Sequence, residues 1–273
     1  MSVPGRFAGG HVLVTGSTGM AASAARAIAA EGGEVFVTSR TAAHLEALAR
    51  EIRDAGGRCE WQAADLREEA AVESVFAAFD SAFGRLDAVY SAAGISGRRF
   101  GDGPIHEATA EGWEAVMTAN ATSQFLVARS AIRRMLAQEP DEAGSRGAVL
   151  LMSSTLATHP APAFFATHAY AASKGAIDAL ARSLAAYYAP RGIRVNAIAP
   201  SLIATPMSRR AQDDPAIRAY LAEKQPLAGG PIGADAVTEA ALWLLSPDAR
   251  MVTGQVVAVD GGWGVSEPRT GGG

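Results

Sequence analysis

Residues 11–30 read His-Val-Leu-Val-Thr-Gly-Ser-Thr-Gly-Met-Ala-Ala-Ser-Ala-Ala-Arg-Ala-Ile-Ala-Ala. The stretch starts with an apolar run of strand length, continues through a Gly-x-x-Gly turn and ends in an Ala-rich segment typical of a helix. Glycine lets a backbone approach a pyrophosphate closely, and the helix N-terminus that follows offers free N–H groups and a positive dipole end. Strand, glycine turn and helix in this order favour a nucleotide site over a plain turn.

The same alternation of strand and helix continues along the chain. Further runs of strand length are found at residues 34–38, 58–62, 86–90, 148–152, 194–198 and 255–259. Most are nearly continuous apolar runs, which indicates burial on both faces. The predicted fold class is therefore α/β, a doubly wound parallel sheet (a Rossmann fold) of about seven strands with helices on both faces.

One domain is expected, over residues 8–265, because no internal repeat or Pro/Ser-rich linker divides the 273 residues. Residues 1–7 are expected to be an N-terminal tail, and the Gly-rich residues 266–273 a flexible C-terminal tail. Residues 206–224 read as a helical pair around Pro215 and are expected to form a lid.

Composition excludes several classes of function. The chain is 49% hydrophobic and 19% charged with a net charge of -4, which predicts a globular core and no nucleic-acid partner. The basic pair Arg98-Arg99 is interpreted as a solvated loop. Cys59 is the only cysteine, and no His, Asp or Glu cluster has metal-ligand spacing. No apolar run suits a signal peptide or a membrane span, so a cytoplasmic protein with no membrane partner is expected.

A second informative stretch is residues 168–174, His-Ala-Tyr-Ala-Ala-Ser-Lys, which opens a segment predicted to be helical to about Tyr187. Tyr170 and Lys174 are four residues apart, so a helix places them on one face. A phenol titrates near ~10, and a nearby ammonium favours the phenolate. Tyr170, with its pKa lowered by Lys174, is thus a candidate general acid/base, although the pair also arises by chance on amphipathic helices.

The residues after the second predicted strand, Ser39-Arg40, bear on the choice of cofactor. NAD-binding folds place an acidic residue there for the ribose 2′-hydroxyl. This chain has no carboxylate at that point, and Arg40 offers a planar cation suited to a 2′-phosphate. NADP is predicted, with NAD as the alternative; the residues alone also allow Arg40 to be a solvent-facing residue at a helix start.

Taken together, these residues resemble the short-chain dehydrogenase/reductase family in its compact branch, over about residues 8–264. The matching pieces are Thr15-Gly16-x-x-Gly19, Asp65-Leu66, Ser91-Ala92-Ala93-Gly94, Asn120, Ser154, Tyr170-x-x-x-Lys174, Arg194-Val195-Asn196, Pro200 with Thr205, and Val259-Asp260-Gly261-Gly262.

The resemblance implies a catalytic set of four residues. Tyr170 would exchange a proton with the substrate oxygen while hydride moves between substrate and nicotinamide. Lys174 would lower the pKa of Tyr170 and hold the nicotinamide ribose, Ser154 would orient the carbonyl, and Asn120 would hold a water linked to Lys174. From the residues alone, Ser154 could merely cap a turn while Ser153 points inward, and Asn120 could be a helix-interior residue with a satisfied amide.

Cofactor contacts are implied by the same resemblance. They are Gly16, Ser17, Thr18, Gly19, Met20, Ser39, Arg40, Asp65, Leu66, Ala92, Ala93, Gly94, Asn120, Tyr170, Lys174, Pro200, Ile203 and Thr205.

The chain departs from the family pattern at four places; two of them are single residues, Ser91 in place of an Asn and Ser201 in place of a Gly. The glycine turn is one residue shorter than usual, with Ala21 or Ala22 where a third glycine would stand. The segment between Ser154 and Tyr170 is about three residues longer than usual, and this insert, residues 158–165, is expected to reshape the substrate pocket. His159 and His168 are interpreted as partly exposed loop residues, with substrate contact as the alternative.

The predicted function is that of an NADP-dependent oxidoreductase for a ketone or secondary alcohol, working as a homo-oligomer, a tetramer or dimer. An NAD-dependent dehydrogenase and a non-catalytic cofactor-binding scaffold or sensor remain alternatives. An epimerase or dehydratase is less favoured because the chain ends soon after the last strand. An enoyl reductase is less favoured because that branch spaces its Tyr and Lys further apart.

Overall fold

The computed structural model describes residues 5–267 of the chain. Its centre is a seven-stranded sheet in the order β3-β2-β1-β4-β5-β6-β7, and every pairing is parallel. The strands are β1 His11–Thr15, β2 Glu34–Ser39, β3 Cys59–Ala63, β4 Ala88–Ser91, β5 Gly147–Met152, β6 Ile193–Pro200 and β7 Val256–Val259. The predicted fold class is confirmed.

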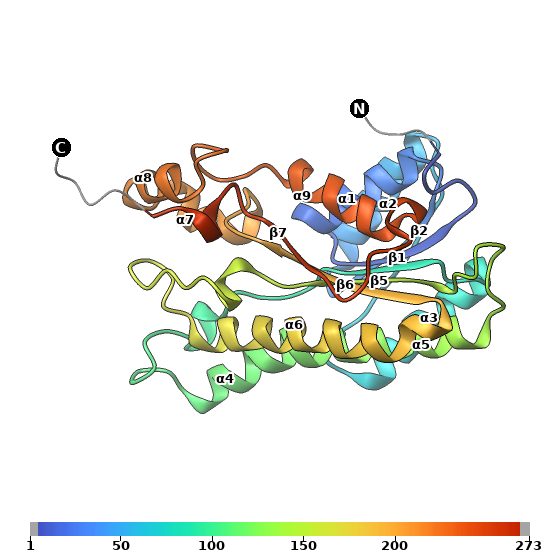
Figure 1. The fold of residues 1–273 in the computed structure, drawn as a ribbon, viewed down its shortest axis with the longest axis horizontal. Coiled ribbons are helices and arrows are strands. Elements are labelled where there is room, and N and C mark those ends of the chain that lie inside the picture. Colours follow the sequence, from blue (N-terminus) through green and yellow to red (C-terminus); the bar gives the residue numbers. More distant parts are fainter. Residues whose placement is uncertain (1–4, 268–273) are drawn as a thin grey trace.

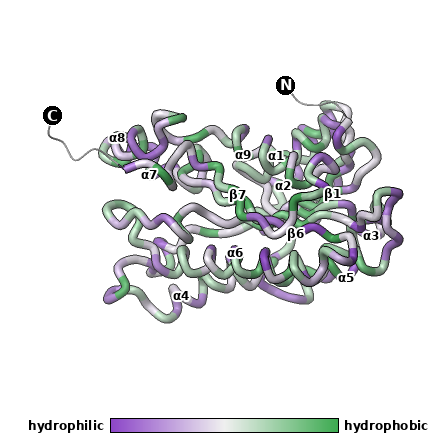
Figure 2. Tube along the Cα trace, viewed as in Figure 1, coloured by the Kyte–Doolittle hydropathy of each residue, from purple (hydrophilic) through white to green (hydrophobic). Residues whose placement is uncertain are grey.

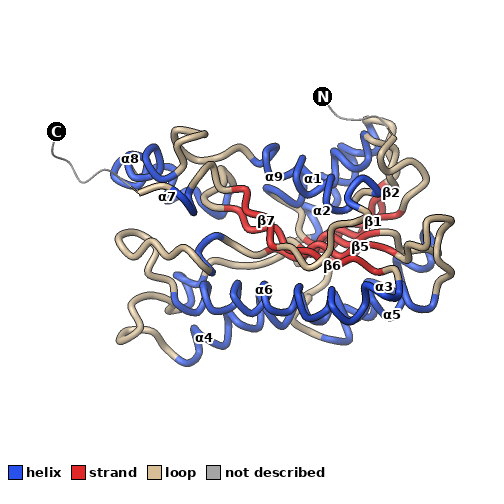
Figure 3. The backbone as a smooth tube through the Cα atoms, in the orientation of Figure 1, coloured by secondary structure: helices blue, strands red, loops and turns tan. Residues whose placement is uncertain are grey.

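Two layers of helices enclose the sheet, as Figures 1 and 3 show. The helices are α1 Gly19–Ala30, α2 Ala42–Asp54, α3 Glu69–Phe83, α4 Ala110–Met117, α5 Ser123–Ala137, α6 His168–Tyr188, α7 Arg209–Asp213, α8 Pro215–Lys224 and α9 Ala234–Leu245. One core lies between the sheet and α1, α2 and α9, and the other lies between the sheet and α3, α5 and α6.

Alternate residues of each central strand enter opposite cores. Val12 and Val14 of β1 pack on the α1 side, and Leu13 packs on the α3 side. This burial on both faces is what continuous apolar strands require, and Figure 2 shows hydrophobic residues along the central strands with hydrophilic ones toward the outer loops.

The strand order reverses direction between β1 and β4. From β1 the chain runs outward to β2 and β3, and it then returns to β4 and continues outward on the other side. In open α/β sheets ligands bind in the crevice at the carboxyl ends of the strands at such a point. The long connections after β4, β5 and β6, together with α7 and α8, gather at this end of the sheet (Figure 1).

The helical segment that follows Thr109 is interrupted by one π-helical turn, Thr118–Thr122, between α4 and α5. A π turn inserts a residue into the helical register, which re-aims the side chains around it, and such turns are frequent at functional sites. Asn120 lies at its centre and is buried.

The predicted helical pair at residues 206–224 is formed by α7 and α8. The Asp214 carboxylate accepts hydrogen bonds from the N–H groups of Ala216 and Ile217, so it caps α8, and Pro215 occupies the first helical position. Ile217 and Leu221 of α8 are buried in a third, smaller apolar cluster with Trp263. This cluster holds the two helices over the carboxyl end of the sheet.

The ends of the domain can be compared with the predicted boundaries. Arg6 pairs with Glu31 at 2.5 Å and Phe7 is buried, so residues just before position 8 pack against the domain. Residues 1–4 and 268–273, most of the two predicted tails, lie outside the described residues. Within residues 5–267, none of the helices combines the length and apolar character that crossing a bilayer requires.

Candidate active site

Two adjoining cavities occupy the carboxyl end of the sheet. The first has a volume of about 200 Å³ and the second about 220 Å³, and Gly94 and Ile95 line both. The predicted residues that line the first cavity are Met20, Ala92, Gly94, Ser154, Tyr170, Lys174, Pro200, Ile203 and Thr205. Those that line the second are Gly16, Ser17, Thr18, Ser39, Arg40, Asp65, Leu66, Ala93 and Gly94.

The shortened glycine turn connects β1 to α1 without a capping side chain. Gly16 has φ +109° and Gly19 has φ +56°, a region that favours glycine. A Cβ built on Gly16 would lie 2.8 Å from the Ala21 Cβ, and one on Gly19 would lie 3.0 Å from the Thr205 Cγ2. The Thr18 side chain makes no capping hydrogen bond to α1. The turn therefore presents an uncapped helix N-terminus beside the second cavity, which suits a pyrophosphate.

The far side of the second cavity is polar and carries cations. The hydroxyls of Ser17 and Ser39 lie 2.8 Å apart. Asp65 is paired with Arg67 at 2.5 Å, and this hydrogen-bonded guanidinium lowers the pKa of the Asp65 carboxyl. Arg40 is exposed and has no side-chain hydrogen bond or ion pair within residues 5–267. Arg40 is thus free to meet an anion at this end of the cavity, where the donor set fits an adenosine phosphate.

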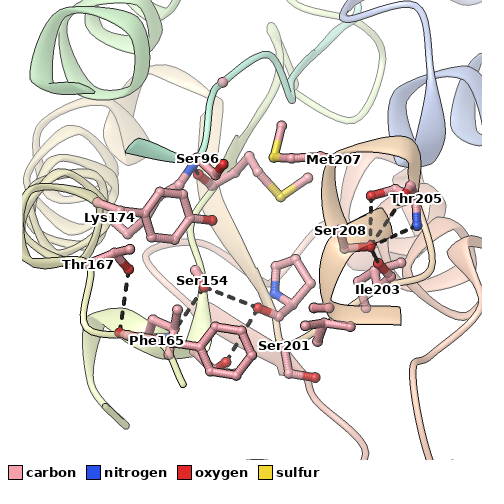
Figure 4. Close-up of a pocket in the computed structure, with 18 of the residues that line it drawn as sticks. Ser96, Ser154, Phe165, Thr167, Lys174, Ser201, Ile203, Thr205, Met207 and Ser208 are labelled. Atoms are coloured by element: carbon pink, nitrogen blue, oxygen red, sulfur yellow. Dashed lines mark hydrogen bonds between the residues drawn. The ribbon is translucent and has the colours of Figure 1, made fainter. Parts of the chain in front are cut away.

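Tyr170 and Lys174 lie in the first turns of α6, and both line the first cavity. The Lys174 ammonium lies 5.5 Å from the centre of the Tyr170 ring and donates to the Met152 carbonyl at 2.7 Å. Figure 4 shows Lys174 and Ser154 across the cavity from Thr205 and Ser208.

The predicted lowering of the Tyr170 pKa by Lys174 is wrong in this structure. Burial raises the pKa of the Tyr170 phenol, and the hydrogen bond with Ser154 opposes this rise. Burial also lowers the pKa of Lys174 to about 7, against the charge of Asp178, which raises it. Both side chains are shielded from water, and burial favours the neutral form of each. For the Tyr170 phenol, the effect of burial on the pKa therefore outweighs the effect of the neighbouring Lys174 amine.

Ser154 caps a turn, as one interpretation allowed, and it also lies at the cavity. Its hydroxyl accepts from the Leu156 N–H at 3.2 Å, which caps a short 3₁₀ turn, and it donates to the Pro200 carbonyl at 3.4 Å. It also lines the cavity beside Tyr170, and it lowers the pKa of the Tyr170 phenol. Ser153 lines the cavity as well, and its hydroxyl donates to the Lys174 carbonyl at 3.4 Å.

Asn120 lines neither cavity, because its side chain is fully engaged. Its Oδ1 accepts from the Ile95 N–H at 2.8 Å, and its Nδ2 donates to the Ile95 carbonyl at 3.2 Å and to the Ser173 hydroxyl at 3.1 Å. A Cβ on Gly94 would lie 2.8 Å from this Oδ1. The amide therefore ties the loop after β4 to α6 and holds the segment that separates the two cavities.

One buried carboxylate at the site was missed from the sequence. Asp102, 4% exposed, accepts from the N–H groups of Ala169 at 3.0 Å and Tyr170 at 2.9 Å. It therefore caps the start of α6 from a loop far away in the chain, while Thr167, the residue before α6, supplies no capping hydrogen bond. No local signal connects Asp102 with α6, because the two segments meet only in the folded chain.

Replacing Asp102 with alanine is expected to lower the free energy of unfolding by about 1–2 kcal/mol, as for lost helix caps, and to reduce kcat because Tyr170 loses its anchor. Urea unfolding and steady-state kinetics measure the two effects. Asp141→Ala is the matched control, because Asp141 makes the same kind of contacts, to the N–H groups of Ala143 and Ser145, and lines neither cavity. Equal kcat values in the two variants would contradict a positioning role for Asp102.

The insert at residues 158–165 contributes an aromatic wall. Phe165 lines the first cavity and packs on Trp263, with ring centres 6.0 Å apart, and Phe164 packs on Tyr220 at 5.2 Å. His159 and His168 are exposed and line neither cavity; His159 lies in a loop, as interpreted, whereas His168 is the first residue of α6.

Arg98 is exposed, in agreement with its interpretation as part of a solvated loop, but it also lines the first cavity, as does Arg210 of α7. Arg98 sits in a 3₁₀ turn, Gly97–Phe100, that folds the loop after β4 back toward the cavity, and its guanidinium donates to the Phe164 carbonyl. Within the described part of the chain, no group of three or more His, Cys, Asp or Glu side chains is arranged to hold a metal ion.

Comparison with known proteins agrees with this geometry. A family model described as enoyl-(acyl carrier protein) reductase matches residues 14–264. The chain is 35% identical over 258 residues to cis-4-hydroxycyclohexanecarboxylate dehydrogenase of Sinomonas cyclohexanicum, covering 94% of this chain and 97% of the relative. It is 35% identical over 263 residues to glucose 1-dehydrogenase of Gluconobacter oxydans (strain 621H), covering 94% and 92%.

A solved structure resembles the chain over nearly its full length. This gluconate 5-dehydrogenase from Burkholderia cenocepacia J2315, in complex with NADP and tartrate, gives a TM-score of 0.85 at 29% identity and covers 95% of this chain and 96% of its own. The fold, the site and these relatives define an NAD(P)-dependent oxidoreductase that acts on CH–OH groups. The chain belongs to the short-chain dehydrogenase/reductase family.

Proposed function

We propose that this protein is an NADP-dependent oxidoreductase that interconverts a secondary alcohol and a ketone, with Tyr170 as the general acid/base. The observation that carries the proposal is the meeting of Tyr170, Ser154 and Lys174 in one cavity that adjoins the phosphate turn through Gly94 and Ile95. A bound nicotinamide cofactor supplies the hydride chemistry, and this chain's residues bind, orient and exchange the proton.

The proton-handling residues have distinct roles. The Tyr170 hydroxyl gives a proton to the ketone oxygen or takes one from the alcohol, and Ser154 orients that oxygen through its own hydroxyl. Because burial raises the pKa of Tyr170, the phenol is protonated at neutral pH, which favours its role as an acid toward a ketone. Lys174, with a pKa of about 7, can exchange a proton near neutral pH. Asn120 acts on the set by positioning the loop at Ile95.

NADP preference is supported by the cations at the second cavity. Arg40 follows β2, where a 2′-phosphate is bound in related nucleotide folds, and Arg67 already neutralises the nearby Asp65. The Asp65 carboxylate, which would otherwise repel a 2′-phosphate, is therefore neutralised by its ion pair. The N–H donors of the Arg40 guanidinium remain available to bind that phosphate. A relative solved with NADP is consistent with this choice.

Replacing Arg40 with alanine is expected to weaken NADP binding about 10- to 100-fold, as expected for a lost charge-assisted hydrogen bond, and to leave NAD binding nearly unchanged. Fluorescence titration of both reduced cofactors measures the ratio of their Kd values. Arg50→Ala is the control, because Arg50 is an exposed residue of α2 that pairs with Glu46 and lines neither cavity. An unchanged ratio in Arg40→Ala would leave NAD as the favoured cofactor.

A further inference from the structure

The first cavity is lined by three cationic residues and by no Asp or Glu. The cations are Lys174, Arg98 and Arg210. Lys174 is buried, donates to the Met152 carbonyl and lies beside Tyr170, so it belongs to the proton-transfer set. Arg98 and Arg210 have no place in that set, and their presence in a cavity with an apolar wall calls for another explanation.

Arg98 approaches the cavity from the loop that follows β4. Its guanidinium donates to the Phe164 carbonyl, which fixes the side chain against the insert. A guanidinium has five N–H donors, so most of them remain for a ligand. Burial lowers the pKa of Arg98, the charge of Arg210 lowers it further, and the charge of Asp102 opposes both effects. Asp102 is already engaged by two N–H groups of α6, so it compensates Arg98 only in part.

Arg210 approaches from α7, on the lid. Its neighbours Met207, Ser208 and Ala211 line the same cavity, and Arg210 has no side-chain hydrogen bond or ion pair within the described part of the chain. Both side chains are exposed at the mouth of the cavity, and the charge of Arg210 lowers the pKa of Arg98, so the two guanidinium groups lie close enough to interact. An anion bound between them would relieve this repulsion, and their exposure leaves both accessible to a ligand.

We propose that the substrate carries a carboxylate that binds between Arg98 and Arg210 while its alcohol or ketone carbon lies at Tyr170. A carboxylate matches the planar fork of a guanidinium and accepts two parallel hydrogen bonds from it. The cavity volume of about 200 Å³ lies below the usual range of ligand pockets, so the substrate is a small hydroxy acid or keto acid. This inference rests on the proposed function and specifies its substrate class.

The reaction is balanced without a further reactant. In reduction, the ketone carbon takes a hydride from the reduced nicotinamide cofactor, and the Tyr170 phenol gives its proton to the ketone oxygen and becomes a phenolate. Oxidation is the reverse, in which the phenolate form of Tyr170 takes the hydroxyl proton of the alcohol. The carboxylate takes no part in bond formation and serves only to fix the distance between Tyr170 and the anchored end of the substrate.

The test uses a ladder of secondary alcohols in two forms. 3-Hydroxybutyrate, 4-hydroxypentanoate, 5-hydroxyhexanoate and 6-hydroxyheptanoate are assayed with NADP and NAD, each beside its primary amide, which keeps the shape and removes the charge. The enzyme is expected to prefer one acid of the ladder over its amide. Arg98→Gln and Arg210→Gln are each expected to lower that acid-to-amide ratio of kcat/KM about 10- to 100-fold.

Two neighbouring arginines provide matched controls. Arg99 directly follows Arg98, and Arg209 directly precedes Arg210. Both control residues are exposed and line neither cavity. Arg99→Gln and Arg209→Gln carry the same charge change and are expected to keep the wild-type ratio. Because Arg98 also contacts the insert, Arg210→Gln, which breaks no internal bond of the described chain, decides the case if Arg98→Gln fails to fold.

The outcomes separate the two proposals. Turnover with equal rates for acids and amides, or equal ratios in the test and control variants, overturns the carboxylate inference and leaves the oxidoreductase proposal standing. If neither the acids nor the amides are oxidised, the proposed oxidoreductase activity fails for these alcohols. The carboxylate proposal is then tested separately, by calorimetric measurement of 5-oxohexanoate binding in the presence of NADP. Binding that is lost in Arg210→Gln supports it, and an absence of binding to the wild type overturns it.

Discussion

Tyr170→Phe is expected to reduce kcat about 10²- to 10⁴-fold, the usual contribution of a positioned general acid/base, while the Kd of the cofactor stays the same. The change removes a single hydroxyl, that of a residue which lines the first cavity together with Ser154. The ring remains, so packing is preserved and only proton transfer is lost. Turnover and cofactor binding are measured on the same preparation, so that a folding defect is not mistaken for a catalytic one.

Tyr187→Phe is the control for this variant. Tyr187 lies on the same helix, α6, its side chain is exposed, and it lines neither cavity. It loses the same hydroxyl without access to a substrate, so its kcat is expected to equal that of the wild type. Full turnover in Tyr170→Phe would remove Tyr170 from the mechanism and favour a water or another side chain as the proton donor.

Lys174→Met is expected to abolish most of the turnover and, unlike most core substitutions, to stabilise the protein at neutral pH. Burial lowers the pKa of Lys174 from 10.5 to about 7. Between these values the unfolded chain binds a proton that the folded chain does not, so wild-type stability rises with pH across this window. The free-energy cost of burying the charged Lys174 side chain in the folded protein is fully present below about pH 7 and disappears near pH 10.5.

The advantage of Lys174→Met should therefore be largest near pH 7, at most about 5 kcal/mol, and should shrink as the pH approaches 10.5. The Met152 carbonyl keeps the Gln124 amide as a donor at 3.0 Å, so the substitution leaves no buried acceptor unpaired. Urea unfolding of both proteins across that pH range measures the difference. Arg182→Met, which removes an exposed cation of the same helix, should show no such pH-dependent gain. A constant difference across the range would show that Lys174 is not titrating there.

The fold was predictable because its signals are local. Most strands are short apolar runs and most helices are Ala- or Leu-rich segments, and parallel pairing follows from their alternation. The glycine turn was predictable for the same reason, since Gly16 and Gly19 adopt positive φ values that a short strand-to-helix turn demands. The residues that line the candidate active-site cavity were predicted largely from the spacing of residues in α6 and at the ends of β5 and β6.

Features that depend on chain segments distant in sequence were not predictable. Asp102 caps α6 across the tertiary structure, and the π turn around Asn120 breaks a helix whose residues show no local helix breaker. Arg98 is exposed, as interpreted, but its place at the cavity was not predictable, because the insert that receives its hydrogen bond lies far along the chain. The direction of the Tyr170 pKa was missed because spacing gives proximity to Lys174 but not the degree of burial.

The small apolar cluster beside the first cavity has a practical consequence for redesigning specificity. Ala161 of the insert, Ile217 and Leu221 of α8, and Trp263 near the chain end share that cluster, separate from the two cores that hold the sheet. A graft that exchanges only the insert between relatives would leave mismatched shapes against α8 and Trp263. The insert, α8 and the residues around Trp263 should therefore be exchanged together. The sheet and its flanking helices can then be kept unchanged.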